Sequence, residues 1–386
     1  MGITKCNNLM DFRAIAKRSL PTPVFHYIDG GADDEVTLRR NTSAFDDYEL
    51  MPSQLHDVSD VRMQSSLFGE AVDWPVMISP TGASRLFHAS GEPAVARAAS
   101  KFGMFYSLST LGTTTIENAA AASDGPKMYQ IYIFKDRGLT EEWITRCKEA
   151  GYKALALTVD VAISGNRERD LLYGFAASPR SRIRQVMSFA RHPAWLYRAL
   201  VQKNLDMVNI TSSEAAAAAL LAGVRQFIAD QLERSLTWKD VEWLAERWDG
   251  PLVIKGVQSV EDCRRASESG ASAVMISNHG GRQLDSAPAP VDCISDVADA
   301  LRDRLEIICD GGIRRGSHVV KALALGANAC SIGRGYVYAL AAGGQPGVER
   351  ALTLLRAEVE RTLALIGCND VSDLNRRYVI HRSTTT

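Results

Sequence analysis

Short apolar runs recur along this chain, and most are separated by a longer segment of helical character. Eight runs have the length and composition of strands that are buried on both faces. They are Pro75–Pro80, Met104–Ser109, Lys127–Tyr132, Ala154–Asp160, Leu252–Lys255, Ala273–Asn278, Glu306–Asp310 and Ala329–Gly333. Strands that alternate with helices predict a parallel α/β sheet, and eight repeats predict a (β/α)8 TIM barrel.

Glycines close several of the helical segments, at Gly103, Gly151, Gly270 and Gly326. Glycine just past a helix supplies the left-handed backbone that caps it, so each of these residues predicts the order helix, glycine, next strand. The spacing breaks once, between Asp160 and Leu252, which predicts a long insertion after the fourth strand.

We expect a single domain over residues 1–386. Residues 1–70 are predicted to form an N-terminal helical extension, residues 75–345 the barrel, and residues 346–386 a C-terminal helix and tail. The 386 residues are 46% hydrophobic, and a barrel of this length can bury one large core.

Composition excludes several classes of protein. The net charge of −1 gives no general attraction to nucleic acid. The seven cysteines are scattered, odd in number and without a CxxC pair, so we expect neither a disulfide framework nor a metal site, and a reducing compartment fits. The N-terminus lacks a signal pattern, and no apolar run reaches the length of about 18 residues that spans a membrane. We therefore expect a cytoplasmic protein, unless it lies on a membrane surface.

The stretch Ser277–Asp285, SNHGGRQLD, follows the apolar run Ala273–Ile276 directly. Active sites of barrels gather at the carboxyl ends of the strands, where this stretch would lie. The imidazole of His279 can take a proton near neutral pH, and the guanidinium of Arg282 can bind a carboxylate through two hydrogen bonds. Polar or flexible residues also stand at the other predicted strand ends, at Gly82, Ser109, Gln130, Tyr132, Thr158, Asp160, Lys255, Asp310, Gly333 and Arg334.

Two glycine- and arginine-rich loops follow the last two predicted strands, Asp310–Gly316 (DGGIRRG) and Gly333–Gly335. Phosphate sites of barrels form from the loops after strands seven and eight. These loops therefore predict a phosphorylated cofactor, bound with its ring over the mouth of the barrel.

With these motifs the chain resembles the FMN-dependent L-2-hydroxy-acid oxidases and dehydrogenases. The resemblance runs from Phe25–Ala32 (FHYIDGGA) to Ile366-Gly367, and SNHGGRQLD is its most specific motif. It implies FMN as the cofactor and oxidation of an (S)-2-hydroxy acid to the 2-oxo acid. The α-hydrogen would leave either as a hydride or through a carbanion.

The resemblance also implies roles for individual residues. His279 would be the catalytic base, with Asp160 stabilising its imidazolium. Arg167 and Arg282 would bind the substrate carboxylate, and Tyr27 and Tyr132 would hydrogen-bond the substrate. Lys255 would lie beside the flavin and stabilise its reduced, anionic form. The implied FMN contacts are Pro80, Thr81, Gly82, Ser109, Gln130, Thr158, Lys255, Ser277, Asp310, Gly311, Gly312, Arg314, Gly333 and Arg334.

Two other functions stay open at this point. A lysine at a strand end is also a feature of Schiff-base aldolases, so Lys255 could form an imine with a carbonyl substrate. The chain could also be a non-catalytic FMN-binding protein.

The predicted insertion has an unusual composition. Between Ala176 and Leu205 it holds six basic residues and no Asp or Glu. Apolar residues are interleaved with them at Ile183, Val186, Met187, Phe189, Trp195, Leu196, Tyr197 and Leu200, and Ile183, Val186, Met187 and Ala190 share helical spacing. Basic and aromatic residues together favour an anionic membrane surface, so residues 176–215 are a candidate membrane-interaction segment; a solvated loop or an oligomer contact is the alternative.

Similarity to the membrane-associated dehydrogenases implies the inner face of the cell membrane, a quinone as acceptor and a homo-oligomer such as a tetramer. Gly82 supports this expectation, since oxidases of the family commonly carry alanine there; a soluble oxidase that makes hydrogen peroxide is the alternative. Thr237–Asp240 is similar to lactate dehydrogenases, whereas Gly165–Asp170 is similar to mandelate dehydrogenases. Gly82 and Leu111 leave room for a side chain larger than methyl, so we expect a mandelate-like acid ahead of L-lactate.

Overall fold

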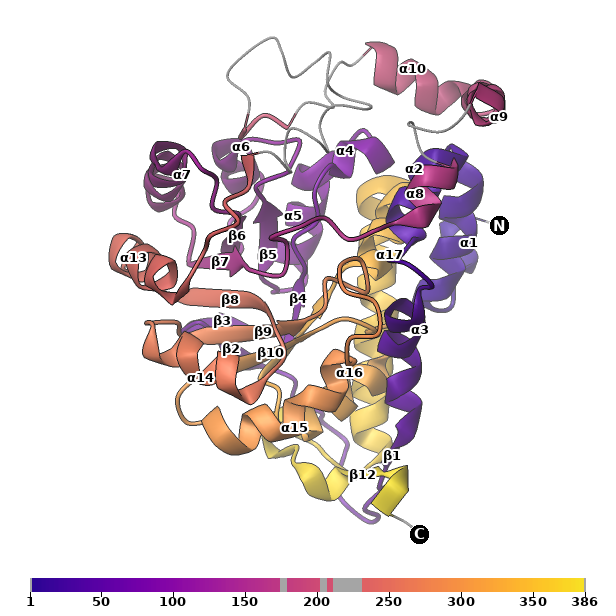
Figure 1. The fold of residues 1–386 in the computed structure, drawn as a ribbon. Helices are drawn as coiled ribbons and strands as arrows, with labels where there is room; N and C mark the ends of the chain where they lie inside the picture. Colours follow the sequence, from indigo (N-terminus) through magenta and orange to yellow (C-terminus); the bar gives the residue numbers. More distant parts are fainter. Residues whose placement is uncertain (1, 174–178, 202–206, 211–230, 385–386) are drawn as a thin grey trace.

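Eight parallel strands form one sheet in the computed structural model, which describes residues 2–173, 179–201, 207–210 and 231–384. They are β4 (Val76–Ile78), β5 (Tyr106–Ser109), β6 (Lys127–Ile131), β7 (Ala154–Thr158), β8 (Leu252–Val257), β9 (Ala273–Ser277), β10 (Glu306–Asp310) and β11 (Ala329–Ile332). The order is β4-β11-β10-β9-β8-β7-β6-β5, and Ile78 N donates a 2.9 Å hydrogen bond to Phe105 O, next to β5. The two edges thus meet in a near-closed barrel, and the TIM-barrel prediction is confirmed (Figure 1).

All eight predicted strands are present, with ends that differ by a few residues. β4 differs most, since it is shorter than the predicted run by one residue at its start and by two at its end, and β8 continues past a bulge after Lys255 to Val257. Helices cover the sheet: α4 (Ser84–Phe87), α5 (Gly91–Lys101), α6 (Ile116–Ala121), α7 (Arg137–Glu149), α13 (Trp238–Trp248), α14 (Val260–Glu268), α15 (Pro290–Leu301), α16 (Gly316–Ala324) and α17 (Arg334–Leu365), which is kinked at Gly343 and Gly344. The four predicted capping glycines, Gly103, Gly151, Gly270 and Gly326, all have positive φ, as a left-handed cap requires.

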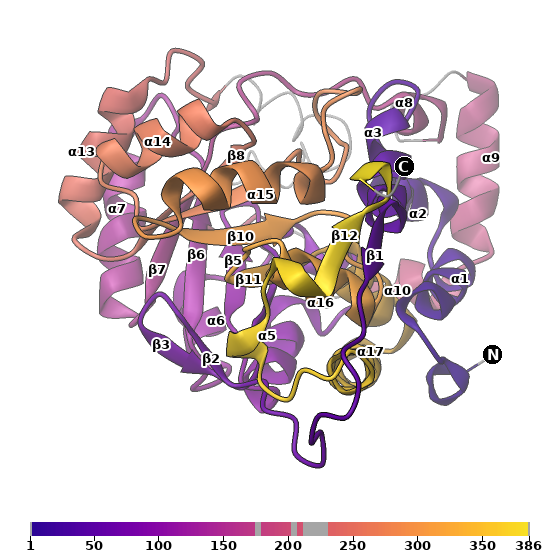
Figure 2. The same cartoon turned by 90° about the horizontal axis from the view of Figure 1, so that it is seen from below.

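A hairpin that the sequence did not predict closes one end of the barrel. Its strands are β2 (Ser65–Leu67) and β3 (Glu70–Val72), and Leu67, Phe68 and Val72 are buried with barrel-interior residues such as Met128. Phe68 N donates a 2.9 Å hydrogen bond to the carboxylate of Glu306, the first residue of β10. The hairpin therefore seals the amino ends of the strands and leaves the opposite end for a site (Figure 2).

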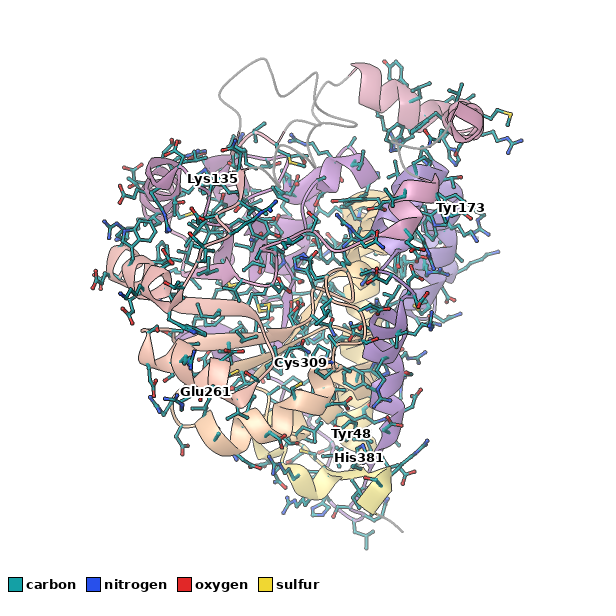
Figure 3. The ribbon with its side chains drawn as sticks, in the orientation of Figure 1. Tyr48, Lys135, Tyr173, Glu261, Cys309 and His381 are labelled. Atoms are coloured by element: carbon teal, nitrogen blue, oxygen red, sulfur yellow. The ribbon has the colours of Figure 1, made fainter. Side chains whose placement is uncertain are left out.

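The N-terminal segment folds as helices along one flank of the barrel (Figure 1). These are α1 (Leu9–Ser19), α2 (Thr22–Asp29) and α3 (Val36–Ser43), with short 3-10 turns at Ile3–Lys5 and Ala44–Asp47. Further along, β1 (Tyr48–Leu50) pairs antiparallel with β12 (Val379–His381), and Tyr48 and His381 lie side by side in Figure 3. Three 3-10 turns, Val371–Asp373, Arg376–Tyr378 and Arg382–Thr384, complete the tail.

The insertion after β7 contributes α8 (Glu168–Tyr173), α9 (Pro179–Ala190) and α10 (Pro193–Val201). The Oγ atom of Ser188 accepts a 2.8 Å hydrogen bond from Thr22 N, and Trp195 Nε1 donates one of 2.8 Å to Leu86 O. Phe189 and Trp195 pack against the body of the protein. These two aromatic residues belong to the apolar set of the predicted membrane-interaction segment, and their inward packing leaves fewer members of that set to face a membrane.

Part of the predicted membrane-interaction segment lies outside the described residues. This applies to Lys203, to residues 211–215 and to the side chains of Arg180, Arg182, Ile183, Arg184 and Leu200. Among the helices that the structure describes, none is long and apolar enough to cross a membrane.

Candidate active site

A cavity of about 250 Å³ opens at the carboxyl ends of the barrel strands. Most of the predicted site residues line it: Tyr27, Pro80, Thr81, Gly82, Ser109, Tyr132, Arg167, Lys255, His279, Arg282, Asp310, Gly311, Gly312, Arg314, Gly333 and Arg334. Four others lie immediately behind this wall. Gln130 accepts a 2.7 Å hydrogen bond from Ser109, Ser277 contacts Lys255, Asp160 contacts His279, and Thr158 ends β7. The structure therefore brings together residues from every barrel strand and from the N-terminal segment.

His279 and Asp160 form a hydrogen-bonded pair. Nδ1 of His279 lies 3.0 Å from Oδ1 of Asp160, which leaves the other ring nitrogen for the cavity. His279 has φ of +58°, a strained value for a non-glycine residue, and its N–H donates a 3.0 Å hydrogen bond to Ser277 Oγ. Burial would raise the pKa of Asp160, but the charges of His279 and Lys255 hold that pKa below its ordinary value. Asp160 is therefore ionised and can stabilise an imidazolium when His279 takes a proton.

Two arginines stand around the ring of Tyr27. The guanidinium of Arg282 lies 5.1 Å from the ring centre, and that of Arg167 lies 5.9 Å from it. Arg282 donates hydrogen bonds to the carbonyl oxygens of Tyr27 (2.7 Å) and Gly30 (3.1 Å), so its head is fixed. Burial and the neighbouring charge of Arg167 lower the pKa of Arg282 to about 9. This concentration of positive charge favours a small anion such as a carboxylate.

Tyr132 completes this part of the cavity. Its side chain is 8% exposed, and burial raises the pKa of its phenol well above the ordinary value. The phenol therefore keeps its proton and can donate a hydrogen bond.

Lys255 lies at the floor of the cavity in a cluster of buried polar groups. Its Nζ is 2.8 Å from Oδ2 of Asp310 and donates a 2.9 Å hydrogen bond to Ser277 Oγ. Burial would lower the pKa of Lys255, but the carboxylates of Asp310 and Asp160 raise it above the ordinary value. A Schiff-base lysine has to lose its proton before it attacks a carbonyl group. The geometry therefore disfavours the aldolase alternative.

Arg314 and Arg334 form a cationic cradle beside the two glycine-rich loops. Arg334 donates to the carbonyl oxygens of Ile28, Gly280 and Gly30 at 2.7–2.9 Å, and Arg314 donates to Ile313 O at 2.7 Å. Within the described residues neither guanidinium has a carboxylate partner, and burial lowers the pKa of both. A phosphate group would supply the missing negative charge.

Gly312 shows how closely this cradle is packed. An added Cβ would lie 1.7 Å from Asn41 O, so glycine alone fits at this position.

Among the described residues, two buried donor atoms at the carboxyl ends of β6 and β7 have no hydrogen-bond partner. They are Gln130 Nε2 on β6 and Thr158 Oγ1 on β7, each in a residue that is 2% exposed. An unsatisfied buried donor is costly, and a heteroaromatic ring with polar edges would satisfy both atoms. The donor set and the cationic cradle together fit a phosphorylated flavin.

Comparison with known proteins agrees with this geometry. Residues 16–381 match the family of FMN-dependent dehydrogenases. The chain belongs to this family. An L-lactate dehydrogenase of Xanthomonas campestris pv. campestris (strain 8004) is 41% identical over 366 residues, which cover 95% of this chain and 94% of that protein. Glycolate oxidase 1 of Zea mays is 38% identical over 376 residues, which cover 97% and 96% of the two chains.

Solved structures of similar proteins lead to the same family. A monotopic membrane protein, (S)-mandelate dehydrogenase, superposes with a TM-score of 0.90 at 35% identity and covers 98% of this chain and 100% of its own. FMN is the cofactor of the family, and the expectation of a flavoenzyme is confirmed. This chain is an FMN-dependent oxidoreductase that acts on the CH–OH group of 2-hydroxy acids.

Several residues of the site escaped the sequence reasoning. Ser79 lines the cavity and donates a 2.9 Å hydrogen bond to Asp310, while Phe87, Met207 and Leu232 supply apolar walls. Nothing in the sequence marks these four. Gln283 also lines the cavity, and its place within SNHGGRQLD was a signal that the predicted chemistry did not use.

Proposed function

We propose that this enzyme oxidises an (S)-2-hydroxy acid with a bulky, mandelate-like side chain and passes the electrons to a membrane quinone. L-Lactate is the second candidate substrate. The observation that best supports oxidation of a hydroxy acid is the pairing of Asp160 with His279. Arg167 and Arg282 stand beside this pair, around Tyr27. FMN, when bound, would take up the two electrons and the hydrogen that the α-carbon loses, whether they leave together as a hydride or separately through a carbanion.

Each residue then has a task that its geometry can perform. The carboxylate of the substrate lies between the guanidinium groups of Arg167 and Arg282. The hydroxyl proton moves to the free ring nitrogen of His279, and Asp160 stabilises the imidazolium. Tyr132 donates a hydrogen bond from its hydroxyl group to the substrate, and Arg314 and Arg334 would hold the phosphate of FMN. The Lys255 ammonium would stabilise negative charge on the flavin when it is reduced.

The preference for a bulky acid rests on the apolar wall opposite these polar groups. Phe87, Leu111, Met207 and Leu232 line the same cavity as His279. Gly82 packs against Leu111, since an added Cβ would lie 2.8 Å from Leu111 Cβ. The absence of a methyl group at position 82 thus leaves space for Leu111 and for a larger substrate.

The membrane acceptor rests on where exposed apolar side chains gather. In the part of the chain that the structure describes, 13 large hydrophobic residues are exposed, and seven of them lie between Ile163 and Tyr197. Ile163, Leu171, Leu172 and Tyr173 precede the predicted membrane-interaction segment, and Val186, Met187 and Tyr197 lie within it. Val186 is 66% exposed and Tyr197 64% exposed, and the exposed Arg191 and Arg198 lie on the same segment. Figure 1 places α9 and α10 together at the top of the molecule, near α2. Exposed apolar side chains among arginines suit insertion into an anionic lipid surface.

Vesicle binding tests the membrane part of this proposal. The double variant Val186→Asp/Met187→Asp should lose binding to phosphatidylglycerol vesicles, because charge replaces the two exposed apolar groups. Leu284→Asp is the matched control, since Leu284 is 72% exposed and lies outside the segment. Equal vesicle binding by the double variant and the wild type would contradict the proposal.

The acceptor and the substrate need kinetic measurements. We expect a soluble quinone analogue to reoxidise the reduced enzyme much faster than air does. Rapid steady-state release of hydrogen peroxide, unchanged by the quinone, would favour the oxidase alternative. For the substrate, kcat/KM with (S)-mandelate should exceed that with L-lactate, and the opposite order would reverse the assignment.

A further inference from the structure

The motif Ser277–Asp285 contains a glutamine that the proposed chemistry leaves without a task. The side-chain amide of Gln283 makes three hydrogen bonds, all to backbone atoms of another segment. Nε2 donates to Asp160 O at 2.7 Å and to Ile163 O at 2.9 Å, and Oε1 accepts from Gly165 N at 3.1 Å. Two carbonyl groups and one N–H group fix which end of the amide is nitrogen, because each can pair with only one end.

The segment that Gln283 holds links two parts of the site. It leaves β7 at Val159, carries Asp160, and reaches Arg167 just before α8. Residues 161–167 have no regular secondary structure, so no sheet or helix fixes their backbone. At one end Val159 N donates to Lys255 O at 2.9 Å, and at the other Asn166 O accepts from Asp33 N at 2.8 Å. Gln283 binds the middle of this segment, at Ile163 and Gly165. The side chain of Ile163 is 70% exposed there, so it is not held by packing.

A glycine in this segment gives independent evidence that the two loops are packed in direct contact. A Cβ at Gly165 would lie 2.3 Å from Arg282 O and 2.7 Å from Gln283 O. The backbone at position 165 therefore rests on the backbone of the loop that carries His279 and Arg282. Asp160 and Arg167 lie on one of these two loops, and His279 and Arg282 lie on the other.

We propose that Gln283 is a positioning residue, which sets the place of Asp160 relative to His279 and of Arg167 relative to Arg282. The inference rests on the proposed function, because it assigns the two arginines to the substrate carboxylate. Both N–H groups of the amide are engaged by backbone oxygens, so Gln283 acts through the loop and not through the substrate. Its neutral amide also holds the loop without adding charge next to the Asp160 carboxylate.

The test replaces Gln283 by methionine, which has a similar length and makes no comparable hydrogen bonds. We expect Gln283→Met to keep FMN and to slow anaerobic flavin reduction by (S)-mandelate or L-lactate by roughly 10–100-fold, the cost of a small misplacement of catalytic groups. The Kd for the product benzoylformate, measured by equilibrium titration, should rise about 10-fold as Arg167 moves. Leu284→Ala, at the exposed neighbouring position, should match the wild type in both measurements.

A double-mutant cycle separates positioning from a general structural effect. If Gln283 acts through Asp160, Gln283→Met should slow flavin reduction little further in an Asp160→Ala background. At saturating acid, where weaker binding through Arg167 no longer limits the rate, a full additive loss in that background would overturn the proposal, and so would wild-type reduction and product binding in Gln283→Met alone.

A second variant covers the case in which Gln283→Met does not fold or does not hold FMN. Gly165→Ala pushes the two loops apart from the other side and should give the same slow reduction and weak product binding. Unchanged kinetics in Gly165→Ala would then overturn the proposal. The wild type serves as the separate control for the proposed function: if neither acid bleaches its flavin, that function fails, whatever the variants do.

Discussion

Asn41 and Asn278 exchange two side-chain hydrogen bonds, each 2.7 Å long. Both residues are buried, and Asn278 directly precedes His279. Asn278 Oδ1 also accepts a 3.0 Å hydrogen bond from Gly281 N. A second hydrogen bond joins the motif to α3. The carboxylate of Asp285 accepts a 2.7 Å hydrogen bond from Thr37 N, which lies in the first turn of α3. The loop Ser277–Asp285 is therefore hydrogen-bonded to α3 near both ends of that helix.

Asn41→Ala should lower the stability of the holoenzyme. The substitution leaves the buried amide of Asn278 without two of its partners, which costs about 1–3 kcal/mol. Thermal unfolding measures the loss. Asn278→Ala should also lower Tm, and in the double variant the two losses should not add fully. The control is Arg40→Ala, which removes ion pairs to Asp47 and Asp292 from a side chain that is 41% exposed, so its effect should be small. An equal Tm loss in the control would contradict the assignment.

His279→Asn should keep bound FMN, because the cationic cradle of Arg314 and Arg334 does not involve the imidazole. Flavin reduction by substrate should slow by roughly 10²–10⁴-fold, the usual contribution of a general base. Anaerobic stopped-flow measurement of flavin bleaching checks this. A rate near that of the wild type would show that another group takes the proton.

Lys255→Met should destabilise the protein strongly, since it leaves the Asp310 carboxylate buried without its ion partner. Breaking one side of a buried pair costs about 3–5 kcal/mol. Adding Asp310→Asn should recover most of the Tm loss, because the uncompensated charge is gone. Slow flavin reduction should persist in the double variant, as the ammonium is still missing. Recovery of both properties would argue against a role for the Lys255 charge.

The Asp29 carboxylate predicts a dependence of stability on pH. It is buried and accepts hydrogen bonds from Arg13, Arg169 and Tyr338 at 2.6–2.9 Å. Burial would raise its pKa, but these partners lower the pKa from 3.8 to about 2. Because the folded-state pKa is depressed, the stabilisation is present above pH 4 and is lost as the pH falls towards 2.

Asp29→Asn should therefore lose about 2 kcal/mol of stability at neutral pH. Its Tm deficit should shrink between pH 4 and pH 2, where the wild-type carboxylate takes a proton. Thermal scans of both proteins over this range test the expectation. A deficit that stays constant with pH would show that the charge of Asp29 is not what stabilises the fold.

Gly82→Ala should change substrate preference. The new methyl would lie 2.8 Å from Leu111 Cβ and 3.0 Å from Leu111 O, so Leu111 has to move into the cavity. We expect kcat/KM to fall by about 10-fold or more for (S)-mandelate and by less for L-lactate, which needs less space. Leu111→Ala in the same protein should restore part of the loss. Equal losses for the two acids would place the side-chain pocket elsewhere.

The barrel was predictable because its strands are buried on both faces and glycines mark the helix ends. β2 and β3 were not predictable, since three-residue strands are too short to show a period. The pairing of β1 with β12 also leaves no local signal, because its partners are far apart in the sequence. For the insertion, composition indicated a surface segment. It could not indicate that Trp195 packs inward, because that depends on a tertiary hydrogen bond to Leu86 O.

For the site, the residues that perform chemistry have distinctive types, and the motif identified them. Gln283, Asn278 and Asp285 are in the same motif, yet their partners are backbone groups and a distant asparagine. Which backbone groups face them is decided only when the N-terminal segment and the β7–α8 loop fold onto the barrel. Ser79 and Met207 have ordinary types at ordinary spacing, so no pattern distinguishes them.

The pairing of β1 with β12 has a consequence for the synthesis of the protein. Arg382, next to β12, pairs with Glu49 of β1, which the ribosome makes 333 residues earlier. The segment that carries Tyr27 and Asn41 precedes β1, and the strand that pairs with β1 is among the last residues to be made. A nascent chain stalled before residue 379 would contain all the barrel strands but could not form the β1–β12 pair. We therefore expect FMN to be captured after translation, and a stalled or truncated chain to be a substrate for proteases.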